Sequence, residues 1–201
     1  MRGDRCVVLA SASPRRRALL ATFFPDLVVD VPLKEEGFKG GSPHGLVEAL
    51  AQGKAREVAS RHPQALIIGA DTVVVVDGEI LGKPGSRRDG VRMLKRLSGR
   101  WHEVVTGLAL ASGDKEVVSH AVTQVLFAPL TPQEIGFYLA TGEPLDKAGA
   151  YGIQGIGGLF VEEIKGSYTN VVGLPLRLLY VLMGELGLDI KSWIYVKGGE
   201  R

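Results

Sequence analysis

Short runs of apolar residues, bounded by glycine, proline and polar residues, recur along the chain and predict strands. Aliphatic and β-branched side chains dominate these runs, as they do in strands that are buried on both faces. The predicted strands are residues 5–10, 27–31, 65–76, 79–82, 101–111, 116–127 and 159–164. The Asp77-Gly78 pair between two of them predicts a hairpin turn.

Capping residues and helical spacing of apolar positions predict helices between these strands. Ser13-Pro14 is a good start for one helix, and Thr131 with Glu134 forms a full capping box for another. The predicted helices are residues 14–23, 42–61, 86–99, 131–142 and 175–185, and glycine-rich residues 142–173 are predicted as loop with one strand. The alternation of helices and strands, with a hairpin and two adjacent long strands, predicts an α/β protein with a mixed sheet.

The composition excludes several classes of protein. The 201 residues are 45% hydrophobic and 23% charged, which is typical of a globular domain and not of a disordered chain. A net charge of +2 is weak support for nucleic-acid binding, and the single cysteine cannot form an intrachain disulfide. No apolar stretch has the length of a membrane span or a signal peptide, so we expect a cytoplasmic protein.

Three consecutive arginines, Arg15, Arg16 and Arg17, stand in the first turn of the helix predicted after Ser13. That end of a helix carries a positive partial charge, so the guanidinium groups repel it and one another. A bound phosphate would reverse this repulsion, with Ser11 and Ser13 as further hydroxyl donors. The alternative is a solvated basic helix start whose arginine side chains point into water.

Lys54 falls within the apolar stripe of the second predicted helix. At about 100° per residue, that stripe consists of Val47, Leu50, Ala51, Ala55 and Val58. A buried ammonium group needs a partner, because an unpaired charge is costly in an apolar environment. Otherwise only the aliphatic stem is buried, and the ammonium group reaches solvent at an edge of the helix.

Asp71 interrupts the long apolar run of residues 65–76, in which Thr72 is the other polar residue. A carboxylate there is either paired or has a raised pKa, and such a group can act as a general base for water. The alternative is a structural aspartate bonded to turn amides or to an arginine. Lys83 ends the predicted hairpin. It can face the same cleft as Asp71, because a hairpin sets its two strands side by side.

Several familiar catalytic motifs are absent. Residues 78–84 resemble a P-loop that is one residue too short, and residues 155–157 lack the third glycine of a dinucleotide fingerprint. The histidines form no HExxH motif, and no GxSxG motif occurs. The remaining cations and the one carboxylate fit an enzyme that handles a polyphosphate with Mg²⁺ or a similar hard cation.

Taken together, these motifs resemble the Maf family of nucleoside triphosphate pyrophosphatases. The matching segments, in family order, are LASASPRRRALL (9–20), QGKA (52–55), GADTVVVVDGEILGKP (69–84), DKAGAYGIQG (146–155) and EIKGSYTNVVGLPL (163–176). The resemblance implies an α/β fold over residues 1–201 as a single domain. A long mixed sheet is flanked by helices, two lobes enclose a deep central cleft, and the usual assembly is a homodimer.

The resemblance also implies a reaction and a site. A nucleoside triphosphate is hydrolysed between its α- and β-phosphates, with Asp71 accepting the proton of the attacking water. Cations neutralise the phosphates and stabilise the transition state, and these are Arg15, Arg16, Lys54 and Lys83. A glutamate in the loop after the second strand helps Asp71 to hold a divalent metal, Mg²⁺ or Mn²⁺. Glu35 fits the spacing best, and Glu36 is the alternative.

Three positions resemble the subgroup of the family that prefers dTTP and UTP. They are Arg15 directly after Ser-Pro, Thr72 after the aspartate, and Gln154 in the Gly-Ile-Gln-Gly stretch. A glutamine amide has both a donor and an acceptor, so it can pair with the N3–H group and a carbonyl of a pyrimidine. We therefore expect a pyrimidine triphosphate pyrophosphatase, with modified pyrimidine nucleotides as further substrates.

Two alternatives belong to other classes of protein. One is a non-catalytic regulator of septum formation and cell division that binds nucleotide or nucleic acid, a role to which family members have been linked. The other is a plain phosphate-sugar binding domain. The small net charge and few aromatic residues argue against nucleic-acid binding. We therefore expect a triphosphate substrate, and neither a membrane nor a stable nucleic-acid partner.

Overall fold

The computed structural model describes residues 6–33 and 41–194, and the strands in that part of the chain form one seven-stranded sheet. The strands are β1 (Val7–Ala10), β2 (Val28–Val29), β3 (Leu66–Val76), β4 (Glu79–Leu81), β5 (Trp101–Ser112), β6 (Lys115–Phe127) and β7 (Val161–Lys165). Their order is β2-β1-β3-β5-β6-β7, and β4 pairs with β3. Strand β1 pairs in parallel with β2 and β3, whereas the β3–β4 and β6–β7 pairs are antiparallel. The predicted mixed α/β sheet is confirmed.

Helices alternate with these strands along the chain. The α-helices are α1 (Pro14–Ala21), α2 (Pro43–Ala59), α3 (Arg87–Leu97), α4 (Pro132–Ala140), α5 (Tyr168–Val172) and α6 (Leu176–Glu185). Short 3-10 helices are η1 (Glu143–Asp146), η2 (Ala148–Ala150), η3 (Ile156–Phe160) and η4 (Ile190–Ser192). The caps predicted from sequence are present, because Ser13 accepts a hydrogen bond from the amide of Arg16 and the Thr131–Glu134 capping box is complete.

The chain divides into two compact units. The first unit consists of residues 1–71, 107–120 and 176–201, and the second consists of residues 72–106 and 121–175.

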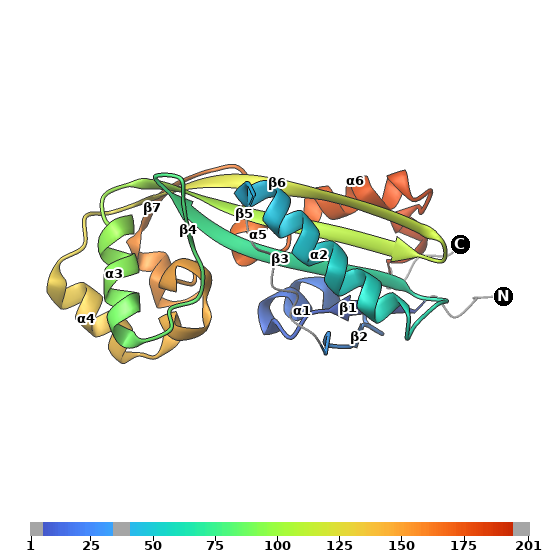
Figure 1. Cartoon of the computed structure of the whole chain (residues 1–201), viewed down its shortest axis with the longest axis horizontal. Coiled ribbons are helices and arrows are strands. Elements are labelled where there is room, and N and C mark those ends of the chain that lie inside the picture. Colours follow the sequence, from blue (N-terminus) through green and yellow to red (C-terminus); the bar gives the residue numbers. More distant parts are fainter. Residues whose placement is uncertain (1–5, 34–40, 195–201) are drawn as a thin grey trace. The chain divides into compact units, whose positions relative to one another are not determined.

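Helix α2 packs closely on the strands of the first unit (Figure 1). Its buried residues are Val47, Ala51, Ala55 and Val58, whereas Leu50 of the predicted stripe is half-buried. A Cβ atom on Gly69 would lie 2.3 Å from the carbonyl oxygen of Ala51, and one on Gly107 would lie 2.1 Å from that of Val47. Glycine at these two strand positions therefore lets the helix backbone approach the sheet.

The second unit has its own aromatic and aliphatic core, to which α3 and α4 contribute buried side chains. Phe127 contacts Tyr151 with ring centroids 4.7 Å apart, and Tyr138 contacts Phe160 at 5.2 Å. His102 is 2% exposed and bonds through Nε2 to the Tyr151 hydroxyl at 2.9 Å. This core holds the glycine-rich segment that follows α4.

Two elements differ from the prediction. Strand β2 has two residues instead of the predicted five, and both are exposed valines, Val28 and Val29. The stretch predicted as loop with one strand contains three 3-10 helices, β7 and α5. Helix α5 has only five residues and depends on its ends, where the Ser167 hydroxyl accepts a hydrogen bond from the Asn170 amide and Gly173 adopts a φ of 109°. So short a helix leaves no periodic signal in the sequence.

Candidate active site

Two serines shape the turn from β1 into α1 in the first unit. Ser13 caps the helix, as predicted, and Ser11 is buried. The Ser11 hydroxyl accepts hydrogen bonds from the Ser13 amide at 3.3 Å and from Nη1 of Arg16 at 3.0 Å. The turn is therefore ordered by side chains that were predicted to bind phosphate.

Arg16 turns inward and joins α1 to β3. Its Nη1 atom also donates to the carbonyl oxygen of Ala70 at 3.0 Å, and the residue is 8% exposed. Burial is the main cause that lowers the pKa of Arg16 to about 10. The charge of Asp71 raises this pKa, and the charge of Arg15 has a smaller effect that lowers it. Arg16 thus remains a cation at neutral pH. It is not solvated at the helix start, whereas Arg17 is exposed and Arg15 is half-buried.

Asp71 and Lys54 form an ion pair between β3 and α2. The Lys54 ammonium group donates to Oδ1 of Asp71, and the two side chains are 26% and 20% exposed. Of the two outcomes considered for Lys54, the ammonium group therefore has a partner, Asp71, and is also partly exposed. Asp71 is only half-buried, although it lies in an apolar strand. Part of this ion pair is therefore open to solvent.

The structure therefore brings Ser11, Ser13, Arg16, Lys54 and Asp71 together in the first unit. Arg16 bonds to the residue immediately before Asp71, and Lys54 bonds to Asp71 itself. The two nearby cations keep this carboxylate ionised, and they can bind phosphate oxygens next to it.

Thr72 lies in the second unit, at the head of a chain of hydrogen bonds. The Thr106 hydroxyl donates to the carbonyl oxygen of Asn170 at 3.2 Å, and Thr72 and Thr106 hydroxyls are 3.0 Å apart. Because a hydroxyl has one proton, Thr72 is the donor to Thr106. Asn170 is fully buried and its Nδ2 donates to Val104 at 2.9 Å and to Thr123 at 3.0 Å.

Lys83 and Gln154 also belong to the second unit, and both are exposed. The β3–β4 pairing ends at Leu81, two residues before Lys83. Gln154 stands in the turn between η2 and η3. Each side chain is accessible to a ligand.

Of the metal ligands predicted from the sequence, only Asp71 lies within the residues that the structure describes. Glu35 and its alternative Glu36 lie outside the described residues. Across residues 6–33 and 41–194, no three His, Cys, Asp or Glu side chains form a metal-binding group. Asp71 fits a hard cation, because its Oδ1 atom is taken by Lys54 and Oδ2 accepts no hydrogen bond from the described part of the chain. Mg²⁺ commonly binds one or two carboxylates together with substrate phosphates.

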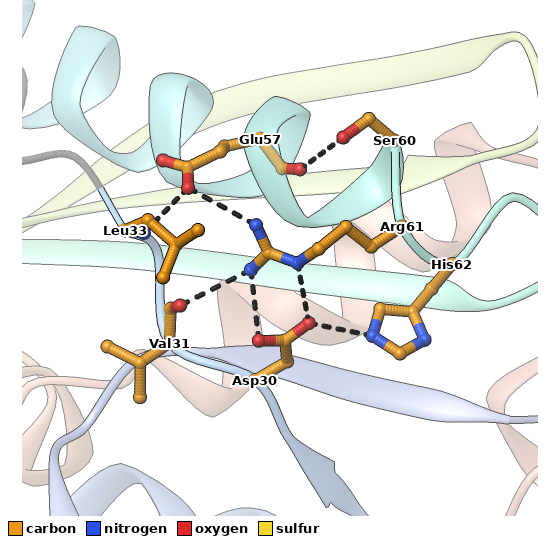
Figure 2. Close-up of polar contacts among 7 residues, drawn as sticks. All are labelled: Asp30, Val31, Leu33, Glu57, Ser60, Arg61 and His62. Carbon is orange, nitrogen blue, oxygen red and sulfur yellow. Dashed lines mark hydrogen bonds and ion pairs between the residues drawn. The ribbon is translucent and has the colours of Figure 1, made fainter.

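The segment that leads from β2 toward these glutamates is attached to the end of α2 (Figure 2). Arg61 bonds to both carboxylate oxygens of Asp30 at 2.9 Å, and His62 bonds to Asp30 at 2.8 Å. Glu57 accepts a hydrogen bond from Nη1 of Arg61 at 3.2 Å and another from the amide of Leu33. Hydrogen bonds from Arg61 and His62 lower the pKa of Asp30 to about 2. These bonds therefore attach residues 30–33 to the end of α2.

Sequence reasoning missed Asn170, Thr106, Tyr138 and Glu143. Asn170 directly precedes the apolar residues Val171 and Val172, but it follows Ser167, Tyr168 and Thr169, so the sequence did not mark it as a buried hydrogen-bonding group. Tyr138 and Glu143 have no signal either, because their partners are backbone amides of a loop further along the chain.

The comparisons with known proteins agree with one another. The family model described as Maf-like protein matches residues 6–186. A dTTP/UTP pyrophosphatase of Symbiobacterium thermophilum is 51% identical over 185 residues, which are 92% of this chain and 95% of that protein. A dTTP/UTP pyrophosphatase of Thermococcus gammatolerans is 50% identical over 186 residues, covering 92% and 99% of the two chains.

Among solved structures, the Ham1 protein of Staphylococcus aureus is similar in fold. The TM-score is 0.54 at 16% sequence identity, and the match covers 90% of this chain and 100% of that one. In the described part of the chain, no helix combines the length and apolar character needed to cross a membrane.

Proposed function

The chain belongs to the Maf-like protein family, and from this premise we propose that it hydrolyses dTTP and UTP to the monophosphate and pyrophosphate. Relatives at about half identity over nearly their full length bear the name dTTP/UTP pyrophosphatase, which supports this activity. The observation that carries the proposal is the position of Asp71, which is bonded to Lys54 and directly follows the residue bonded to Arg16.

Asp71 acts as the general base. Lys54 holds the Asp71 carboxylate in place through Oδ1, and the carboxylate takes the proton from the attacking water. The water oxygen forms a bond to the α-phosphorus, and the bond from that phosphorus to the bridging oxygen breaks. Pyrophosphate leaves with the electron pair of that bond.

The cations provide electrostatic stabilisation. Arg16 stays protonated, since its pKa of about 10 lies well above neutral pH. We infer that Arg15, Arg16, Lys54 and Lys83 bind phosphate oxygens, with Ser11 and Ser13 as hydroxyl donors. Charge that develops on these oxygens is stabilised by groups already in place before the reaction.

Asp71 and Glu35 are the residues that we expect to hold a divalent cation, Mg²⁺ or Mn²⁺. When bound, such a cation neutralises charge on the triphosphate. Thr72 and Gln154 are assigned to recognition of the nucleoside. We further propose a cytoplasmic homodimer that acts as one domain over residues 1–201 and binds neither membrane nor nucleic acid.

Pyrophosphate release from dTTP, UTP and 7-methyl-GTP, with Mg²⁺ or Mn²⁺, tests the proposal. Turnover of dTTP and UTP is expected, and Asp71→Asn should lower kcat at least about 10²-fold. Asp114→Asn, at the exposed tip of the β5–β6 hairpin, is the matched control. Inactivity on all three nucleotides would overturn the proposal, and nucleotide binding without turnover would favour a regulatory protein instead.

A further inference from the structure

The turn that carries Gln154 is held by side chains from a separate part of the second unit. Residues 152–157 read Gly-Ile-Gln-Gly-Ile-Gly; they follow η2, and the last two are the first residues of η3. The amide of Gly155 donates to the carbonyl oxygen of Gly152 at 3.3 Å, which closes the turn around the exposed Gln154. Local backbone bonds of this kind fix the turn weakly, so its position depends on other contacts.

Glu143 binds the backbone after Gln154. Its Oε2 atom accepts from the amide of Ile156 at 2.9 Å, and Oε1 accepts from the amide of Gly157 at 3.2 Å and from the Tyr138 hydroxyl at 2.8 Å. Burial opposes the charge on Glu143, but these hydrogen bonds outweigh it and lower its pKa. The carboxylate is therefore ionised at neutral pH, and charged acceptors make the stronger hydrogen bonds.

Tyr138 binds the backbone before Gln154. Its hydroxyl accepts from the amide of Gly152 at 3.0 Å while it donates to Glu143. The side chain is fully buried, and burial raises its pKa, so the hydroxyl keeps its proton. Tyr138 and Glu143 together thus hold the turn on both sides of Gln154.

The glycines of the turn make room for these contacts. A Cβ atom on Gly155 would lie 2.4 Å from Oε2 of Glu143, and one on Gly157 would lie 2.4 Å from the Tyr138 hydroxyl. Lys147 in turn bonds through Nζ to the carbonyl oxygen of Glu143 at 2.6 Å. The spacing of glycines therefore matches the two side chains that hold the turn.

We propose that Glu143 and Tyr138 are positioning residues for nucleobase selection, because they fix the backbone on which the Gln154 amide is presented. This inference rests on the proposed function and on the assignment of Gln154 to the base. An amide discriminates between bases only if its donor and acceptor are held in register with those of the base. Neither Glu143 nor Tyr138 needs to touch the nucleotide.

Steady-state kinetics with dTTP, UTP and dCTP tests the inference with Glu143→Gln and Tyr138→Phe. Glutamine has the shape of glutamate but presents an amide nitrogen to backbone donors. We expect KM for dTTP and UTP to rise about tenfold with little change in kcat, and preference over dCTP to fall as in Gln154→Ala. Glu163→Gln, an exposed position on β7, should leave all of these values unchanged.

Amide hydrogen exchange gives a readout that does not depend on activity. In Glu143→Gln, exchange at Ile156 and Gly157 should accelerate at least tenfold, while exchange in β3 should stay unchanged. Unaltered exchange at these two amides would overturn the inference, whatever the steady-state kinetics show. It would also be overturned if Gln154→Ala changed base preference and Glu143→Gln did not. Absence of turnover in the wild-type protein would instead contradict the proposed function.

Discussion

The ammonium group of Lys54 donates a hydrogen bond to Oδ1 of Asp71, which joins α2 to β3 in the first unit. This pair fixes the carboxylate and places a positive charge beside it. Lys54→Met keeps most of the apolar stem and removes the charge. We expect it to lower kcat/KM for dTTP by about 10²- to 10³-fold, because a cation beside the reacting phosphates is lost.

The matched control for Lys54 is Lys115→Met, at the exposed start of β6. It removes the same charge from the same unit at a position without a role in the proposed reaction. Equal losses of activity in both variants would show that net charge, and not the pair with Asp71, is responsible.

Arg16 forms two hydrogen bonds with one nitrogen, to Ser11 and to the carbonyl oxygen of Ala70. Arg16→Lys keeps the charge but loses the planar group that reaches both acceptors. We expect the free energy of unfolding to fall by about 1–2 kcal/mol and kcat/KM to fall at least tenfold. Urea denaturation and steady-state kinetics measure the two effects, and Arg17→Lys on the same turn is the exposed control. A fully active, equally stable variant would contradict the positioning of Arg16.

Asn170 is a buried donor to two acceptors, Val104 and Thr123. Asn170→Asp replaces the donating nitrogen with an oxygen and places a carboxylate against the Val104 carbonyl. The free energy of unfolding should fall by about 3–5 kcal/mol in urea denaturation, the cost of an unpaired buried charge. Gln133→Glu makes the corresponding change at an exposed position in the first turn of α4 and should cost nothing, since negative charge is favourable there. Similar stability of Asn170→Asp and the wild type would contradict this account.

The features predicted well from the sequence are those encoded by neighbouring residues. Ser13 before Pro14, and Thr131 three residues before Glu134, fix helix starts through local hydrogen bonds. The place of Lys54 in an apolar stripe left two outcomes open, a partner for the ammonium group or its exposure at an edge of the helix. The structure shows that Lys54 is paired with Asp71 and is also partly exposed, which the residue identities alone did not decide.

The features that the sequence did not predict depend on contacts between distant residues. The inward turn of Arg16 requires the carbonyl oxygen of Ala70, which is 54 positions away. The contacts of Glu143 with Ile156 and Gly157 cross a glycine-rich stretch that has no periodic pattern. Such contacts arise only once the core of each unit has brought the segments together.

His102 is a buried histidine whose titration should make stability depend on pH. Burial lowers its pKa from 6.5 to about 4 in the folded protein. The unfolded chain therefore binds a proton at a higher pH than the folded protein does, so acidification favours unfolding. The free energy of unfolding should fall by about 3 kcal/mol between pH 6.5 and pH 4 through this group. Below pH 4 its contribution no longer changes.

Urea denaturation at pH 7, 5.5 and 4 measures this dependence. His102→Gln keeps a group that can bond to Tyr151 but cannot titrate, so its stability should vary much less over the same range. Asp30 adds little over this range, because its pKa falls from 3.8 to about 2 on folding, so its own effect on stability comes mainly below pH 4. An identical pH dependence in the variant and the wild type would show that other groups cause it.

Gly69 and Gly136 predict opposite effects of the same substitution. Gly69 lies under α2, and a Cβ atom there would be 2.3 Å from the carbonyl oxygen of Ala51, a backbone atom that cannot move without displacing the helix. Gly136 lies in α4, where an added Cβ atom meets nothing within 4 Å.

Gly69→Ala should therefore lower the free energy of unfolding by at least about 3 kcal/mol, and it should lower activity too, because α2 carries Lys54. Gly136→Ala should raise that free energy by about 0.5–1 kcal/mol, since alanine loses less backbone entropy in a helix. Thermal and urea unfolding of the two variants test the close approach of helix and sheet, which would be contradicted if Gly69→Ala were as stable as the wild type.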